Sequence, residues 1–149
     1  MVLFFNHESQ YSRAFFEKLY PSLYADYIST GKVRLSLVPV PFQKFVRSEE
    51  AASFLLCGAA QTKTQEMNAL LLAGIPDDAS MKTAGIDGAK IRACAPSADT
   101  LLQKQRQRSW IADLDIQLVP TYFVDEKKFI GLPEWPDMRG QIEEALRFH

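Results

Sequence analysis

The chain has 149 residues, of which 47% are hydrophobic and 23% are charged, and its formal net charge is −1. This length fits one domain with a buried core, and the near-neutral charge argues against a nucleic-acid partner or an anionic membrane surface. No apolar run approaches the length of about 18 residues that a membrane span requires, and the two histidines are not spaced as metal ligands. We therefore expect a globular protein with no membrane span and no metal site.

The first forty residues predict a strand, a helix and a second strand. Val2–Phe5 is a short apolar run, typical of a buried strand. Apolar residues recur at helical spacing from residue 9 to about residue 29; Pro21 should kink this helix and Gly31 should end it. The alternating stretch 32–40 predicts the second strand. A helix between two strands favours parallel pairing through a right-handed crossover.

The middle of the chain predicts helices only. Helical patterns cover residues 49–72, 86–95 and 97–113, and residues 77–85 are expected to form a loop or a short turn. Cys57 and Cys94 lie in two of these helices and do not form a Cys-x-x-Cys pair. We favour the interpretation that both are small buried hydrophobic residues, and the alternative is a disulfide between the helices.

The C-terminal part predicts a hairpin followed by a helix. Thr121–Val124 and Lys128–Gly131 are expected to be strands joined by a polar turn, and residues 134–148 carry a helical apolar stripe. The element order is then β-α-β, a helical insertion at about residues 45–114, and β-β-α. We expect one domain over residues 1–149, because no repeat or linker interrupts the chain.

Several segments follow one another in the order of a known fold. The stretches LVPTYFV, DEKKFIGL and DMRGQIEEAL resemble the cis-proline loop, the hairpin and the last helix of the DsbA-like thiol–disulfide oxidoreductases. The resemblance covers essentially the whole chain and implies an α/β thioredoxin-like fold of the DsbA type, with a helical insertion. It also implies that the Val119–Pro120 bond is cis and that an extended polypeptide or a small thiol binds between the first helix tip and Val119-Pro120-Thr121.

The chain departs from this family at the start of the first helix. The family has Cys-x-x-Cys there, and this chain has Ser9-Gln10-Tyr11-Ser12. The resemblance places Ser9 and Ser12 at the positions of the catalytic cysteines. Disulfide exchange requires a thiolate that attacks sulfur, which a serine hydroxyl cannot supply. No histidine–carboxylate pair is identified that would activate Ser9 as a hydrolytic nucleophile, so enzymatic activity is left open.

Three interpretations of this motif follow. The first is a redox-inactive relative that binds polypeptide or thiol ligands, with Gln10, Tyr11 and the proline loop as contacts and Ser9 as a helix cap. In the second, SQYS is similar to the Ser-Pro-Tyr-Ser motif of kappa-class glutathione transferases and 2-hydroxychromene-2-carboxylate isomerases. This similarity implies that Ser9 stabilises the thiolate of bound glutathione. The third is an altered copy of an active oxidoreductase in which serines replace both cysteines.

The compartment and the cofactor depend on which interpretation holds. The relatives are mostly exported bacterial proteins, so the resemblance implies an extracytoplasmic location, whereas a native start at Met1 favours the cytoplasm. No cofactor is expected, except glutathione under the second interpretation.

Overall fold

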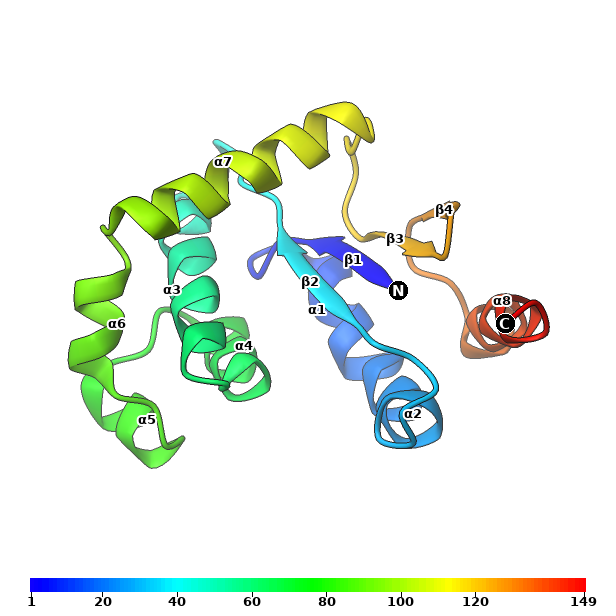
Figure 1. Ribbon diagram of the computed structural model, residues 1–149, viewed down its shortest axis with the longest axis horizontal. Coiled ribbons are helices and arrows are strands. Elements are labelled where there is room, and N and C mark those ends of the chain that lie inside the picture. The colour runs from blue at the N-terminus through cyan, green and yellow to red at the C-terminus, as the bar shows by residue number, and fades with distance from the viewer. The chain divides into compact units, whose positions relative to one another are not determined.

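The computed structural model describes residues 1–149, which divide into two compact units (Figure 1). Unit 1 consists of Met1–Val38 and Ile116–His149, and unit 2 consists of Pro39–Asp115. Unit 1 carries the sheet, and every helix of unit 2 lies within the segment expected to be a helical insertion. The order β-α-β, helices, β-β-α confirms the predicted α/β fold.

The sheet of unit 1 has four strands in the order β2-β1-β3-β4. The strands are β1 (Val2–Phe5), β2 (Ser36–Pro39), β3 (Thr121–Val124) and β4 (Lys127–Ile130). β3 is antiparallel to both β1 and β4, with Phe4 opposite Thr121 in the β1–β3 ladder. Figure 1 shows β1 and β2 running in the same direction, as expected for two strands joined by a helical crossover.

The predicted long first helix is divided into three segments. They are α1 (Gln10–Lys18), α2 (Tyr20–Leu23) and a π-helical turn, η1 (Tyr24–Ile28). Pro21 lies in the first turn of α2, where its missing N–H group is not needed for a helical hydrogen bond. Gly31 follows with a φ of 75°, in the left-handed region expected at a helix end.

Unit 2 contains α3 (Ser48–Ala60), α4 (Thr64–Ala73), α5 (Asp78–Thr83), α6 (Gly88–Cys94) and α7 (Ala98–Asp113). The prediction of one helix over residues 49–72 was wrong, because the chain turns back between α3 and α4. Thr62 has a φ of 57° in this turn. Gly58 lets the two helices approach closely, since a Cβ atom there would lie 2.7 Å from the Cβ atom of Met67. The segment expected to be a loop at residues 77–85 contains α5, which Asp77 caps by accepting a hydrogen bond from the Ser80 amide (2.8 Å).

The core of unit 1 holds α1 against the sheet. Leu3, Phe4 and Phe5 of β1 are buried, and the Phe5 ring meets the Phe16 ring edge to face at 5.2 Å. The last helix, α8 (Trp135–Leu146), buries Met138 on the same core. The turn between β1 and α1 is therefore anchored at both ends. None of the helices combines the length and hydropathy needed to span a membrane.

Candidate functional site

The tip of α1 is built by a tight turn that follows β1. The Ser9 amide donates to the Asn6 carbonyl at 3.1 Å, and the Glu8 amide donates to Asn6 Oδ1 at 2.8 Å. Ser9 is the N-cap of α1, with extended backbone angles, and its Oγ accepts a hydrogen bond from the Ser12 amide at 3.4 Å. Ser9 therefore performs the capping role expected of a serine at this position.

Ser12 connects α1 back to the end of β1. It is completely buried, and its Oγ accepts a hydrogen bond from the Asn6 amide at 3.1 Å. Each of the two serine hydroxyls therefore satisfies a backbone N–H group within ten residues of its own position. Between them, Gln10 and Tyr11 are exposed to solvent.

The proline loop lies beside this turn through the pairing of β1 with β3. The Val119–Pro120 peptide bond is cis. Thr121 lies opposite Phe4 in the ladder, so Pro120 is at the level of Phe5, the last residue before the α1 turn. The Thr121 hydroxyl donates to the Leu118 carbonyl at 2.6 Å, which closes the loop around the proline.

All seven residues predicted for the site belong to unit 1. Ser9, Ser12, Pro120 and Thr121 are buried, whereas Val119 is partly exposed. Of the seven, Gln10, Tyr11 and Val119 are the members that solvent can reach.

Glu8 lies directly before the predicted site residues and was not among those that the sequence singled out. Its Oε2 atom is buried and accepts no hydrogen bond, although the residue immediately precedes Ser9. A buried polar atom that makes no hydrogen bond is costly to the folded state. The only sequence signal was its position directly before the Ser-x-x-Ser motif.

Tyr122 fixes the strand behind the proline loop. Its ring is buried between neighbours from α1 and β4, and its hydroxyl donates to Gln141 Oε1 at 2.6 Å. Burial raises the pKa of Tyr122 to about 12, so the phenol stays neutral over the physiological range.

The two cysteines lie in unit 2 and are bonded to each other, which corrects the favoured interpretation of two separate buried thiols. Cys57 in α3 and Cys94 in α6 form a disulfide with a Cα–Cα distance of 5.9 Å, and no free cysteine remains. No local sequence pattern indicates this pairing, because 37 positions separate the two residues. No group of three or more histidine, cysteine, aspartate or glutamate side chains is arranged as a metal site.

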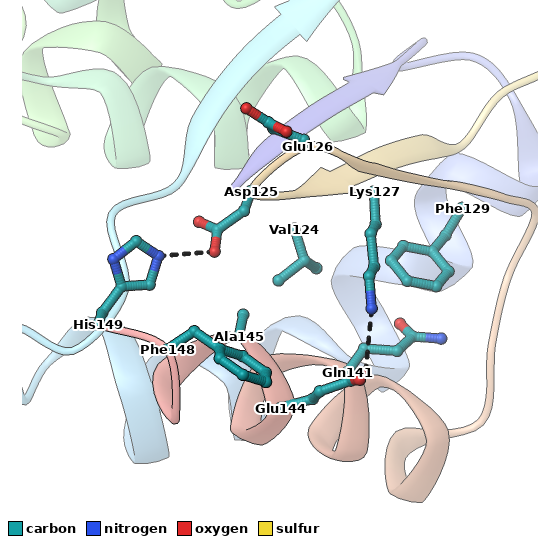
Figure 2. Close-up of a pocket in the computed structure, with 10 residues that line it drawn as sticks. All are labelled: Val124, Asp125, Glu126, Lys127, Phe129, Gln141, Glu144, Ala145, Phe148 and His149. Carbon is teal, nitrogen blue, oxygen red and sulfur yellow. Dashed lines mark hydrogen bonds and ion pairs between the residues drawn. The ribbon is translucent and has the colours of Figure 1, made fainter.

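A pocket of about 590 Å³ lies at the opposite end of β3, around the β3–β4 turn and the end of α8 (Figure 2). None of the predicted site residues lines it. Two ion pairs lie within it: His149 with Asp125 at 2.7 Å, and Lys127 with Glu144 at 3.4 Å. Because these charges already have partners, we assign the pocket no role in the chemistry of the α1 tip.

Comparisons with known proteins agree with this fold. A family model described as thioredoxin matches residues 1–144. The solved structure of BdbD from Bacillus subtilis, in its oxidised form, is 18% identical, with a TM-score of 0.81 over 98% of this chain and 86% of that one. A thioredoxin-like oxidoreductase from Silicibacter pomeroyi DSS-3 is also 18% identical, with a TM-score of 0.79 over 98% and 85% of the two chains.

A third similar structure is the thiol-disulfide exchange protein α-DsbA2 from Wolbachia pipientis. It is 19% identical, with a TM-score of 0.74 over 96% of this chain and 79% of that one. No curated protein matches the chain. The solved structures share the fold of this chain, and the family model covers nearly all of its sequence. The protein therefore belongs to the thioredoxin family.

Proposed function

We propose that this protein is a thioredoxin-family member that binds an extended polypeptide at the α1 tip and performs no disulfide exchange there. The observation that carries the proposal is the unpaired backbone of Val119 beside a helix tip that contains hydroxyls in place of thiols. The neighbouring family structures support the scaffold, and the local contacts support binding without covalent chemistry.

The hydroxyls at the tip are used for structure. Ser9 Oγ accepts from the Ser12 amide, and Ser12 Oγ accepts from the Asn6 amide. A serine hydroxyl is far less acidic than a thiol, and oxygen forms no bond equivalent to a disulfide. The tip can therefore orient a ligand but cannot form a mixed disulfide with it.

The backbone of Val119 is available to a ligand. Its amide and carbonyl make no hydrogen bond within the chain, whereas the Pro120 carbonyl already accepts from the Gly131 amide at 2.8 Å. An exposed pair of backbone groups next to a strand accepts an extended peptide by strand addition. In this mode the main chain supplies affinity and the alternate side chains supply selectivity.

Two exposed apolar side chains lie on the two segments that form the proposed site. Tyr11 is 59% exposed on α1, and Leu118 is 63% exposed immediately before Val119. Apolar side chains of a bound strand would cover both of them. The partner of this site is thus an extended polypeptide segment with apolar residues at alternate positions.

The test is binding of a fluorescein-labelled, cysteine-free peptide of alternating apolar and polar residues, measured by polarisation. Methylation of the peptide nitrogens that face Val119 should weaken binding about tenfold, and methylation in the opposite register should have little effect. Tyr11→Ala should weaken binding several-fold. Tyr24→Ala, which removes a partly exposed tyrosine from η1, is the matched control. The proposal would be contradicted if the affinity were the same for both methylated peptides and were also unchanged by Tyr11→Ala.

A second candidate function rests on the hydrogen atom of the Ser9 hydroxyl. Ser9 Oγ accepts one hydrogen bond, and no acceptor for its own hydrogen is found in the chain. That hydrogen is free to bind the thiolate of glutathione near the start of α1, as in the glutathione-linked enzymes described above. Millimolar glutathione should then raise the melting temperature of the protein by mass action, and Ser9→Ala should abolish the shift. The absence of any shift excludes this candidate.

The remaining alternative is that serines replace the natural cysteines of an active oxidoreductase. The codons for residues 9 and 12 in the natural gene decide it directly. Serine codons support the binding function proposed here, and cysteine codons contradict it.

A further inference from the structure

The disulfide of unit 2 joins two helices that differ in their access to solvent. Cys57 lies in α3 and is 0% exposed, whereas Cys94 is partly exposed at the last position of α6. The neighbours Arg92 and Ala93 are also exposed, so of the two cysteines Cys94 is the one that lies next to solvent. A thiolate attacks a disulfide at one sulfur and expels the other. The burial pattern therefore directs an incoming thiol to Cys94 and makes Cys57 the leaving group.

Thr100 places a hydroxyl beside both sulfur atoms. Its Oγ1 is 3.6 Å from Cys57 Sγ and 3.4 Å from Cys94 Sγ, and Thr100 is buried. Thr100 Oγ1 donates to the Cys94 carbonyl at 2.8 Å and accepts from Ser97 Oγ at 3.1 Å. A hydroxyl oxygen has two lone pairs, so one remains for a thiol hydrogen from Cys57. The buried thiol that reduction would create therefore has an acceptor already in place.

We propose that the Cys57–Cys94 disulfide is a reversible modification site for small thiols, with Cys94 as the sulfur that is attacked. In the first step a thiolate RS⁻ bonds to Cys94 Sγ, the S–S bond breaks, and Cys57 leaves as a thiolate that takes up the proton released by the thiol. In the second step another RS⁻ attacks the outer sulfur of the mixed disulfide and releases the Cys94 thiolate, which is protonated. Two thiols are oxidised to RSSR, and the protein disulfide is reduced to two thiols.

Reduction should open α6 at one end only. The start of α6 is held to the end of α3 by two other hydrogen bonds: the Asp87 amide donates to Gln61 Oε1 at 2.9 Å, and Gln61 Nε2 donates to the Asp87 carbonyl at 3.1 Å. Ile91 remains fully buried in the middle of the helix. These contacts keep α6 in register, so the segment around residues 92–97 loosens and the two sulfurs can meet again on reoxidation.

The test exposes the native protein to millimolar reduced glutathione, followed by alkylation and peptide mass spectrometry. The chain contains only these two cysteines, so each adduct has one possible origin. We expect the glutathione adduct on Cys94 and faster amide exchange in residues 92–97, with no change in α1. An adduct on Cys57 or equal adducts on both cysteines would overturn the proposal. So would a disulfide that glutathione reduces only after urea has unfolded the chain.

Thr100 provides a second readout that a purely structural role would not change. Thr100→Val removes the acceptor for the Cys57 thiol, so the equilibrium with glutathione should shift about fivefold towards the disulfide. Thr100→Ser keeps the hydroxyl and should restore the equilibrium constant of the unaltered chain. An equilibrium constant that Thr100→Val leaves unchanged contradicts the part assigned to this hydroxyl.

Discussion

The α1 tip of unit 1 and the disulfide of unit 2 differ in an opposite sense. The α1 tip has an environment that favours a thiolate but has no sulfur, and the disulfide has sulfur in an environment that disfavours a thiolate. The start of a helix stabilises an anion, because its free N–H groups and dipole favour negative charge. In this protein the side chains at that position are the hydroxyls of Ser9 and Ser12. The place best suited to a reactive thiolate therefore contains no sulfur.

The sulfurs are found where a thiolate is disfavoured. Cys57 is buried within α3, and Cys94 lies at the C-terminal end of α6, where the helix dipole opposes negative charge. The difference teaches that sulfur content alone does not indicate exchange catalysis. The environment of the disulfide disfavours a thiolate at either sulfur, and the α1 tip is the surface that we propose as the peptide-binding site.

The largest expected effect on stability comes from removing the Cys57–Cys94 disulfide. Replacing both cysteines, as Cys57→Ala plus Cys94→Ala, should lower the free energy of unfolding by about 4 kcal/mol, because the bond closes a loop of 37 positions. Urea denaturation of the variant and of the oxidised chain gives the difference. Reduction of the unaltered chain should lower the free energy of unfolding by nearly as much. A loss below about 1 kcal/mol would show that the disulfide contributes little to stability.

The burial of Tyr122 in β3 should make the stability of the protein depend on pH in the alkaline range. Burial raises the pKa of Tyr122 to about 12, above the value of about 10 in an unfolded chain. Between these two values the folded chain holds a proton that the unfolded chain has lost. The free energy of unfolding should therefore fall as pH rises from about 10 to about 12, by up to about 1.4 kcal/mol per pH unit. The slope attributable to this residue is the difference between the unaltered chain and Tyr122→Phe, and equal slopes would show that the phenol does not titrate as described.

Ser12→Ala should destabilise unit 1 by about 2 kcal/mol, because the buried Asn6 amide loses its hydroxyl acceptor. The matched control is Ser29→Ala, which removes an exposed hydroxyl that donates to the Ala25 carbonyl at 2.9 Å. That control should change stability by less than about 0.5 kcal/mol. Equal effects of the two substitutions in urea denaturation would argue against a structural role for Ser12.

The smallest expected effect is that of the cap itself. Ser9→Ala should cost about 1 kcal/mol, and Ser9→Asn should recover most of it, because asparagine is also a good N-cap. Ser97 caps α7 in unit 2 through the Thr100 amide at 3.3 Å, so Ser97→Ala is the corresponding test in the other unit. A loss at Ser9 well above that at Ser97 would indicate that Ser9 does more than cap.

Much of unit 1 could be predicted because its signals are local. The apolar run of β1, the hairpin and the serine N-cap each follow from a few neighbouring residues, and the family resemblance supplied the proline loop. Other features depend on tertiary packing. The break between α3 and α4 has no glycine or proline at residues 61–63, and the packing of the two helices that it permits depends on Gly58 lying close to Met67.

The disulfide and the unpaired oxygen of Glu8 also could not be predicted from sequence patterns. Whether two distant cysteines bond depends on which helix faces meet, and a spacing of 37 positions carries no such information. The isolation of Glu8 Oε2 depends on what surrounds the turn before Ser9. Both are properties of the folded chain and not of any short segment.

Insulin disulfide reduction with dithiothreitol tests the central claim most directly, when the unaltered chain is compared with Ser9→Cys plus Ser12→Cys. The environment of the α1 tip should make the two-cysteine variant accelerate the reaction, while the unaltered chain stays at the uncatalysed rate. Acceleration by the unaltered chain would show that Cys57 and Cys94 exchange rapidly after all. An inert variant would show that the α1 tip does not favour a thiolate.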